Sequence, residues 1–297
     1  NVTYTYSPGT AYEIHALKDI NLSIPDGQFI GIIGHTGSGK STLIQHFNAL
    51  IRPTSGTITY NGEDIWGEKY DRRALRSEVG LVFQYPEHQL FENDVLSDVC
   101  FGPMNQGLSR EEAEVEAKKA LQHVGFKEKN FSKSPFELSG GQKKRVAIAG
   151  VLAMNPKILI LDEPTAGLDP TERVRFRNLI SELSEERIVI LSTHIVSDVE
   201  YIANEIWLMK EGQIVQQGDL DHMLASMQEN VYACEVSQAE ATKMMKQFKV
   251  SNMKAERGMV ELRIIADQPP IHGASVVEPT LEDVFLYYFG EKGGEME

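Results

Sequence analysis

Short apolar runs and alternating stretches dominate the first part of the chain. Val2–Tyr6 and Ile20–Ile24 alternate apolar with polar side chains, which predicts half-buried strands, whereas Phe29–Ile33 is continuously apolar. A continuous run that ends at a glycine predicts a strand buried on both faces. We therefore expect this strand to lead into a glycine-rich turn and then a helix from about Lys40 to Leu50.

Two more buried strands are predicted in the middle of the chain, at Lys157–Leu161 and Arg187–Ser192. The amphipathic stretch Thr171–Leu183 separates them. Strand, helix and strand at this spacing favour a parallel sheet with right-handed crossovers, and therefore an α/β fold. The same patterns predict half a hairpin at Thr57–Tyr60, a helix opened by a capping box at Ser109 and ending near Val124, and a buried helix over Lys143–Met154.

The pattern changes near residue 219. Two methionine-rich amphipathic stretches, Leu220–Met227 and Ala239–Phe248, precede an apolar run at Gly258–Ile265 and a helix-like stretch at Leu281–Phe289. We therefore predict two domains, residues 1–221 and a small α+β unit at 222–297. The methionines are expected to fill a core or an interface, and Tyr287-Tyr288-Phe289 to close the core of the small unit.

Composition narrows the class of protein. The chain has 297 residues, 41% of them hydrophobic, and a formal net charge of −14. This excludes disordered and collagen-like chains, and such an acidic surface repels nucleic acid and anionic lipid at long range. Cys100 and Cys234 lie far apart, which predicts neither a disulfide nor a metal site. No apolar run approaches the roughly 20 residues that span a bilayer, so we expect a cytoplasmic protein that reaches a membrane only through partners.

The segment after the first buried run matches the phosphate-binding loop G-x-x-x-x-G-K-[ST]. Its glycines let successive backbone N–H groups converge on phosphate oxygens, and the following helix points its positive end at the same anion. Lys40 is expected to reach the terminal phosphates of a nucleotide, and the Ser41 hydroxyl to contact Mg²⁺. The predicted loop consists of Gly34, His35, Thr36, Gly37, Ser38, Gly39, Lys40, Ser41 and Thr42.

Two carboxylates, Asp162 and Glu163, end the second buried run. Ligands of open α/β sheets bind at the carboxyl ends of strands, so this pair is placed for catalysis. We expect Asp162 to orient the Mg²⁺ shell and Glu163 to act as general base on the water that attacks the γ-phosphate.

Leu138-Ser139-Gly140-Gly141-Gln142 opens the predicted helix that ends near Met154. Ser139 is a good N-cap, and the two glycines leave backbone N–H groups accessible, so this is a second helix start suited to an anion. Lys143 to Arg145 are expected to form the solvated face of the helix. This string, preceded by the phosphate loop and followed by Ile158 to Glu163, resembles the signature of the ATP-binding-cassette (ABC) ATPases over residues 2–218.

The resemblance implies further roles. Gln84 matches the glutamine that contacts Mg²⁺ and relays nucleotide state to a membrane partner, and His194 matches the histidine that contacts the γ-phosphate. Asp169 matches a residue at the dimer interface. Tyr6 matches the aromatic residue that stacks on adenine, with Tyr4 and Tyr12 as competitors. The family fold combines a parallel core sheet, an antiparallel β part and a helical part that carries the signature. In this family, Ser139, Gly140, Gly141 and Gln142 of one subunit cap the γ-phosphate held by the other.

Different segments of the chain resemble different branches of the family. Tyr85–Phe91, Val99–Asn105 and His35 resemble the ATP-binding subunits of energy-coupling-factor importers of vitamins or transition-metal ions. These importers pair two such ATPases, alike or different, with a transmembrane subunit and a small substrate-binding membrane subunit. Beyond about residue 170, Val189–Glu200 and Glu278–Phe285 are more similar to exporter ATPases. We give more weight to the segment after Gln84, because it contacts the membrane subunit in this family.

The sequence therefore predicts an ATPase that dimerises around two ATP, uses Mg²⁺, and powers an importer from the cytoplasmic face of the membrane. The alternatives are the ATPase of a drug or peptide exporter, a soluble ABC ATPase acting on DNA or ribosomes, and a regulator without turnover. The acidic charge and the single cassette oppose the ribosome type, and the lack of a long coiled-coil insertion opposes the DNA-repair type. The presence of Glu163 opposes the regulator.

Overall fold

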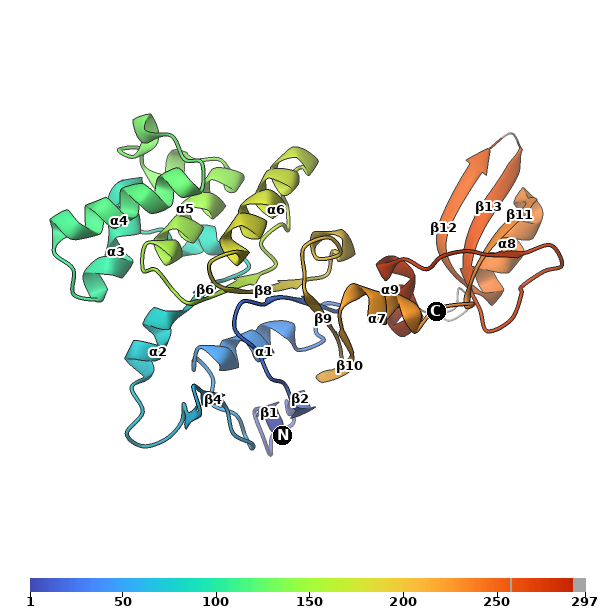
Figure 1. Cartoon of the computed structure of the whole chain (residues 1–297), viewed down its shortest axis with the longest axis horizontal. Helices are drawn as coiled ribbons and strands as arrows, with labels where there is room; N and C mark the ends of the chain where they lie inside the picture. The colour runs from blue at the N-terminus through green and yellow to red at the C-terminus, as the bar shows by residue number, and fades with distance from the viewer. Residues whose placement is uncertain (257, 291–297) are drawn as a thin grey trace.

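The computed structural model describes residues 1–256 and 258–290, and its centre is a largely parallel sheet covered by helices (Figure 1). The strand order is β10-β9-β3-β8-β7-β6, and every pairing is parallel except the pairing of β9 with β10. The predicted buried runs are confirmed, because all of β3 and β8 is buried. The strands are β3 (Phe29–Ile33), β6 (Val79–Val82), β7 (Ile158–Asp162), β8 (Ile188–Thr193), β9 (Glu205–Lys210) and β10 (Gln213–Gly218).

The register brings the carboxyl ends of three neighbouring strands together. Ile33 of β3 lies opposite Thr193 of β8, and Asp162 of β7 lies opposite Ser192. Parallel strands end at the same edge of a sheet, so the segments that follow these strands begin side by side. Those segments are the phosphate loop, Glu163 and His194.

Small antiparallel pieces lie beside one face of the sheet (Figure 1). The prediction of a strand over Ile20–Ile24 is wrong, because the strand is Ile14–Ile20, which pairs with β1 from Ile20 back to Ile14. Leu22 and Ile24 pack partly buried against the core, although neither belongs to a strand. The alternation of apolar and polar residues here reflects alternating burial and not pairing with another strand. The pieces are β1 (Val2–Tyr6), β2 (Ile14–Ile20), β4 (Thr59–Tyr60) and β5 (Glu63–Asp64).

Helices cover the sheet on both faces (Figure 1). One apolar cluster packs α1 and α2 against the sheet together with β1 and β2, and the cluster on the other face packs α3, α4, α5 and α6. The helices are α1 (Lys40–Phe47), α2 (Arg72–Glu78), α3 (Val95–Asn105), α4 (Arg110–His123), α5 (Gly140–Leu152) and α6 (Pro170–Ser184), with single 3₁₀ turns at Pro86–Gln89, Glu128–Asn130, Pro135–Glu137 and Val196–Asp198.

The prediction of a solvated face at Lys143 to Arg145 is wrong. Lys144 is only 7% exposed, and its Nζ donates to the carbonyl oxygens of Pro164 (3.4 Å) and Ala166 (2.5 Å). Arg145 pairs with Glu172 at 2.8 Å. These charges join α5 to the segment that follows Glu163, so neighbouring backbone carbonyls and a carboxylate replace water around them.

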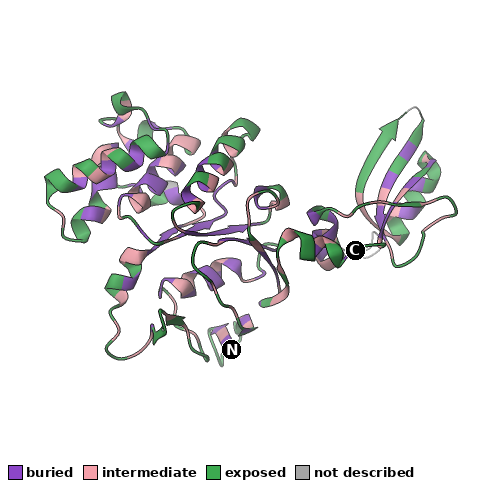
Figure 2. Ribbon diagram, in the orientation of Figure 1, coloured by how far each residue is buried: buried purple, intermediate pink, exposed green. Residues whose placement is uncertain are grey.

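The C-terminal part forms a second, smaller sheet with the order β12-β13-β11-β14, backed by α8 (Figure 1). Its core contains alternating residues of β11 and β13 together with Ala241 and Met244 of α8. The exposed residues of β12 make the outer edge of this sheet (Figure 2). The elements are α7 (Leu220–Ala225), β11 (Val231–Ser237), α8 (Gln238–Gln247), β12 (Lys249–Glu256), β13 (Met259–Ile265), β14 (Ser275–Val276) and α9 (Leu281–Phe289).

Helices α7 and α9 join the larger part of the molecule. Met223, Phe285 and Phe289 belong to the same apolar cluster as α3 to α6, not to the core of the small sheet. The expectation that Tyr287-Tyr288-Phe289 closes the small core is therefore wrong, and Tyr287 is largely exposed. The apolar residues of α9 could pack against either the small core or the large cluster, so the tertiary fold decides which of the two they join.

The division at residue 221 stays a prediction, and residues 257 and 291–297 of the predicted second domain lie outside the described part. Cys100 and Cys234 are buried free thiols in separate clusters. Within residues 1–256 and 258–290, no helix has the length and apolarity needed to cross a membrane.

Candidate nucleotide site

The phosphate loop turns sharply into α1. Gly39 has a φ of 103°, and a Cβ at this position would lie 2.5 Å from the carbonyl oxygen of Ala16, so no side chain fits there. As the N-cap of α1, Gly39 offers no side-chain hydrogen bond to the first N–H groups of the helix. A helix start without a capping side chain is available to an anion.

Lys40, the first residue of α1, points back into the loop. Its side chain is 5% exposed, and Nζ donates to the carbonyl oxygens of Gly34 (2.7 Å) and His35 (3.1 Å). Nζ also lies 3.5 Å from Oε1 of Glu163. Burial lowers the pKa of Lys40, although Glu163 and Asp162 act in the opposite direction. A desolvated cation in a loop of backbone amides attracts phosphate strongly.

Asp162 ends β7 and is 4% exposed. Its Oδ1 accepts a hydrogen bond from Ser192 Oγ at 2.8 Å. Burial raises the pKa of Asp162, against the lowering effect of hydrogen bonds from Ser192 and Ser41. The carboxylate and the Ser41 hydroxyl, which the sequence places on different segments, are therefore neighbours, and a positive charge beside them would relieve the burial of Asp162.

Glu163 lies between the lysine and His194. Its Oε2 accepts from the backbone N–H of His194 (3.3 Å) and lies 2.6 Å from Nδ1 of the same residue. Its φ of 47° is in the left-handed region, which costs a non-glycine residue conformational energy. The side chain of Glu163 is 8% exposed and that of His194 is 47% exposed, so a desolvated carboxylate sits next to an imidazole at the surface. Such a pair can accept and orient a proton.

A cavity of about 500 Å³ opens over the loop. Tyr6 lines it, with its hydroxyl 3.1 Å from Thr42 Oγ1 and its ring edge-on to that of Tyr4. Tyr12 is 82% exposed and does not line the cavity, and Tyr4 packs on His46. Of the three tyrosines considered, Tyr6 alone borders the cavity. The lining residues are Tyr6, Ile14, His15, Ala16, Lys18, Thr36, Gly37, Gly39, Lys40, Ser41, Thr42, Gln84, Glu163, Glu211 and Gly212.

The structure thus brings most of the predicted site together. Gln84 reaches the same cavity from the end of β6, and Asp162 and His194 contact residues that line it. Gly34, His35 and Ser38 lie behind the cavity: the first two supply the carbonyls that hold Lys40, and the Ser38 carbonyl accepts from the Gly212 N–H at 2.9 Å.

Sequence reasoning missed the wall formed by β2 and by the turn at Glu211-Gly212. Ile14, Ala16, Lys18 and these two residues line the cavity because the turn hydrogen-bonds to Lys18 of β2 and to Ser38 of the loop. No motif marks these residues, since backbone contacts place them.

The signature residues lie elsewhere. Ser139 caps α5 in a capping box, in which its Oγ accepts from the Gln142 N–H (3.4 Å) and Gln142 Oε1 accepts from the Ser139 N–H (3.0 Å). Ser139 and Gly140 are exposed, and Ser139, Gly140, Gly141 and Gln142 do not line the cavity. Asp169 is also exposed and caps α6 by accepting from the Thr171 and Glu172 N–H groups. The second helix start therefore lies outside the phosphate-loop cavity of its own chain.

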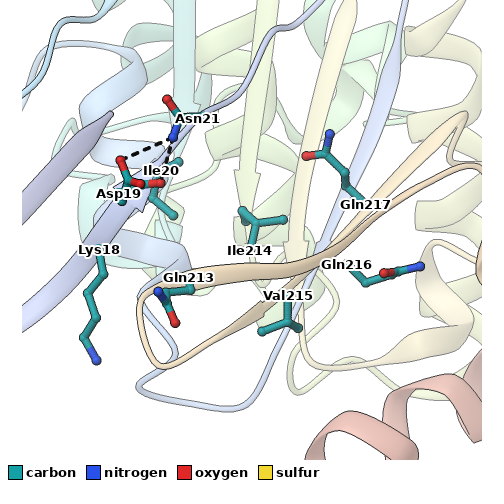
Figure 3. A pocket seen from close by; sticks show the side chains of 9 residues that line it. All are labelled: Lys18, Asp19, Ile20, Asn21, Gln213, Ile214, Val215, Gln216 and Gln217. Atoms are coloured by element: carbon teal, nitrogen blue, oxygen red, sulfur yellow. Dashed lines mark hydrogen bonds between the residues drawn. The ribbon is translucent and has the colours of Figure 1, made fainter.

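Another hollow lies between β2 and β10 (Figure 3). It is bordered by Lys18 to Ile20 of β2, by Asn21 directly after that strand, and by Gln213 to Gln217 of β10. The side chain of Asn21 donates to Asp19. It has neither a helix start nor a buried carboxylate, so the phosphate-loop cavity is the better candidate for chemistry.

The fold and the site are those of a phosphate-loop nucleotide-binding protein of the α/β type. The sequence profile of the family described as "ABC transporter" matches residues 17–166. The energy-coupling factor transporter ATP-binding protein EcfA2 of Caldanaerobacter subterraneus subsp. tengcongensis is 55% identical over 216 residues, which are 72% of this chain and 76% of that protein. The chain therefore belongs to the ABC transporter family, as an ATP-binding subunit that hydrolyses ATP to drive transport.

Solved structures agree with this assignment. The structure of cbiO1 from Clostridium perfringens, part of the ABC transporter complex cbiONQ, is 42% identical, with a TM-score of 0.67, over 75% of this chain and 88% of that chain. A dimeric post-hydrolysis structure of the ATP-binding cassette MJ0796, bound to ADP and Pi, is 31% identical, with a TM-score of 0.67, over 74% and 97% of the two chains. The predicted ABC ATPase fold is confirmed.

Proposed function

We propose that the chain pairs head to tail with a second ABC ATPase, another copy or a sister chain, and that two ATP molecules are held between them. The observation that carries this proposal is the separation of two anion-ready helix starts. One is desolvated beside Lys40 and Glu163, and the other is exposed at Ser139 and lies outside the cavity of its own chain. A second subunit can bring the exposed start to the cavity of the first.

Within each site, the described residues divide the work. Tyr6 stacks on adenine, the N–H groups of the phosphate loop and Lys40 bind the phosphates, and Glu163 removes a proton from the attacking water. His194, in contact with Glu163, orients that carboxylate and contacts the γ-phosphate. Because the side chain of Glu163 is already buried and partnered, little reorganisation is needed when ATP arrives.

A divalent cation fits the donors at this site. Ser41, Asp162 and Gln84 offer only oxygen ligands to a cation, the type that Mg²⁺ prefers. Within the described residues, no group of three or more His, Cys, Asp or Glu side chains is arranged to hold a metal ion. The cation would therefore take its remaining ligands from the nucleotide and water, where it neutralises phosphate charge.

The membrane partner would dock near α3. Directly after Gln84, exposed apolar side chains gather, and Phe91 packs edge-on against Phe101 at 4.8 Å. Exposed aromatic residues in contact mark an interaction surface. The exposed apolar residues of this surface are Tyr85, Phe91, Phe101 and Met104.

By likeness to the EcfA2 proteins, the partner is the transmembrane subunit of an energy-coupling-factor importer of vitamins or transition-metal ions, with a small substrate-binding membrane subunit. The chain would work peripherally at the cytoplasmic face of the membrane. Purification of the native complex tests this branch: a small substrate-binding membrane subunit is expected, and an exporter permease in its place would contradict import.

Mixed pairs test the shared site. Lys40→Ala damages the phosphate loop and leaves Ser139 intact, whereas Ser139→Arg blocks the signature and leaves the loop intact. Each variant alone is expected to lose ATPase activity. An equal mixture regains roughly a quarter of wild-type activity, since half of the pairs then contain one complete site. A mixture no more active than its parents, where wild-type chain alone is active, would contradict the shared site.

A further inference from the structure

The last described helix contacts the phosphate loop, although the two lie near opposite ends of the sequence. The ring of His35 lies 5.1 Å from that of Phe285 and 5.0 Å from that of Phe289, edge-on to both at 70° and 85°. The two phenylalanines stack on each other at 4.5 Å and are 8% and 9% exposed. Edge-on aromatic contacts at these distances are attractive and restrict the orientation of the ring.

His35 is in turn part of the support of Lys40. Its carbonyl oxygen accepts from Lys40 Nζ at 3.1 Å and from the Ser38 N–H at 3.1 Å. The backbone conformation of His35 therefore fixes the position of the carbonyl oxygen that accepts both of these hydrogen bonds. The side chain of His35 lies on α9, while its backbone faces the lysine that we expect to bind phosphate.

We propose that Phe285 and Phe289 are positioning residues for ATP binding, which act through His35 to keep the phosphate loop in its binding conformation. The proposal rests on the phosphate loop being the ATP site. A loop already ordered by packing loses less conformational entropy when the nucleotide binds, and that difference appears as affinity.

Polar contacts hold α9 in place from two sides. Arg263 of β13 donates to Asp283, near the start of α9, with nitrogen–oxygen distances of 2.7–3.1 Å, and Asp283 is 0% exposed. Lys210 of β9 donates to the carbonyl oxygen of Tyr288 at 2.8 Å. Burial alone raises the pKa of Asp283, but hydrogen bonds from Arg263, Ser251 and Thr280 outweigh it and keep the pKa below its ordinary value.

These contacts give the C-terminal part a role. The small sheet is joined through Arg263 to α9, and α9 is joined through its two phenylalanines to the loop that holds Lys40. The small sheet and the phosphate loop are therefore connected through α9. Figure 1 shows α9 between the central sheet and the small sheet, as this path requires.

A double-mutant cycle in the full chain tests the proposal, with the dissociation constant of a fluorescent ATP analogue and the melting temperature measured for each variant. Phe289→Ala is expected to weaken nucleotide binding roughly three- to tenfold, the range of an aromatic contact. His35→Ala is expected to give a similar loss, and the double variant no more than either alone, because both act on one contact.

Controls separate positioning from stability. Phe126→Ala removes a comparably buried ring, stacked on Phe131 in the helical part, and is expected to lower the melting temperature without changing nucleotide affinity. If Phe289→Ala does not fold, Phe289→Leu keeps an apolar side chain and removes the ring contact.

Affinity within twofold of wild type for the folded Phe289 variant, or losses that add fully in the double variant, would overturn the proposal. If Lys40→Ala binds nucleotide as well as wild type, the phosphate-loop assignment fails instead.

Discussion

The two helix starts that carry glycines, at α1 and at α5, differ in how their N–H groups are used. At α1 the cap is Gly39, which offers no side-chain hydrogen bond, and a buried lysine and two buried carboxylates surround the start. At α5 the cap is Ser139, whose capping box already binds an N–H group, and the start is exposed. The first start therefore opens into a cavity of its own chain, whereas the second is capped and exposed to solvent.

In the proposed head-to-tail pair, each chain contributes half of two sites. An uncapped, desolvated helix start is costly without a ligand, because its N–H groups have no acceptor. The loop that precedes α1 is held in place by hydrogen bonds from Lys40 Nζ to the Gly34 carbonyl and from the Gly212 N–H to the Ser38 carbonyl. A capped helix start has a hydrogen-bond acceptor for its N–H groups, so it is stable at the surface without a ligand. Variants at each start are expected to separate affinity from turnover.

Lys40→Ala has the largest expected effect. The substitution removes the cation that is expected to bind the phosphates. It also leaves the buried Glu163 without its lysine partner, and breaking a buried ion pair in this way lowers the free energy of unfolding by about 3–5 kcal/mol. ATP affinity measured by equilibrium binding is expected to fall by roughly 100-fold or more. Lys144→Ala is the matched control, since Lys144 is also a buried lysine that donates to carbonyls, and it is expected to retain affinity. Equal losses in both variants would mean that buried charge, rather than this site, controls binding.

Glu163→Gln is expected to act on turnover alone. The amide keeps the shape of the side chain but cannot accept a proton, so ATP hydrolysis is expected to slow by about 10²–10⁴-fold while nucleotide still binds. Size-exclusion chromatography with ATP is expected to show a trapped dimer. Glu185→Gln, on the exposed surface, serves as the control. A Glu163→Gln chain that remains monomeric with ATP would contradict the head-to-tail pair.

Ser139→Ala is expected to have the smallest effect on the isolated chain. Loss of the cap costs about 1 kcal/mol of stability, and nucleotide affinity stays within roughly twofold because Ser139 does not line the cavity. Turnover at protein concentrations that favour pairing is expected to fall roughly tenfold or more, because a phosphate contact is lost. Ser109→Ala removes the same kind of capping box from α4 and is expected to change stability only. If Ser139→Ala and Ser109→Ala affect turnover alike, Ser139 does no more than cap its helix.

Much of the central fold follows from local pattern. The runs at 29–33, 158–161 and 188–191 are apolar throughout because both faces of these strands are covered, so each run can be recognised from its own sequence. The strand predicted at Ile20–Ile24 differs from β2 because the apolar alternation within β2 is weak. Pairing with β1 decides where β2 begins and ends. The local sequence predicts solvated side chains at Lys144 and Arg145, because their partners are distant in the sequence. Only the folded chain brings the carbonyl of Ala166 to Lys144 and the carboxylate of Glu172 to Arg145.

By itself, the sequence determined the phosphate loop, the carboxylates at the end of β7 and the signature string, because each is a short segment whose function depends on backbone conformation and residue type within it. The tertiary structure alone decided that Glu163 meets His194 and Lys40, that Tyr6 rather than Tyr12 lines the cavity, and that α9 packs on His35. These are contacts between distant segments, and their geometry is set by strand register and by which core an apolar face can reach. An apolar stripe specifies that a helix is buried, but it does not specify against what.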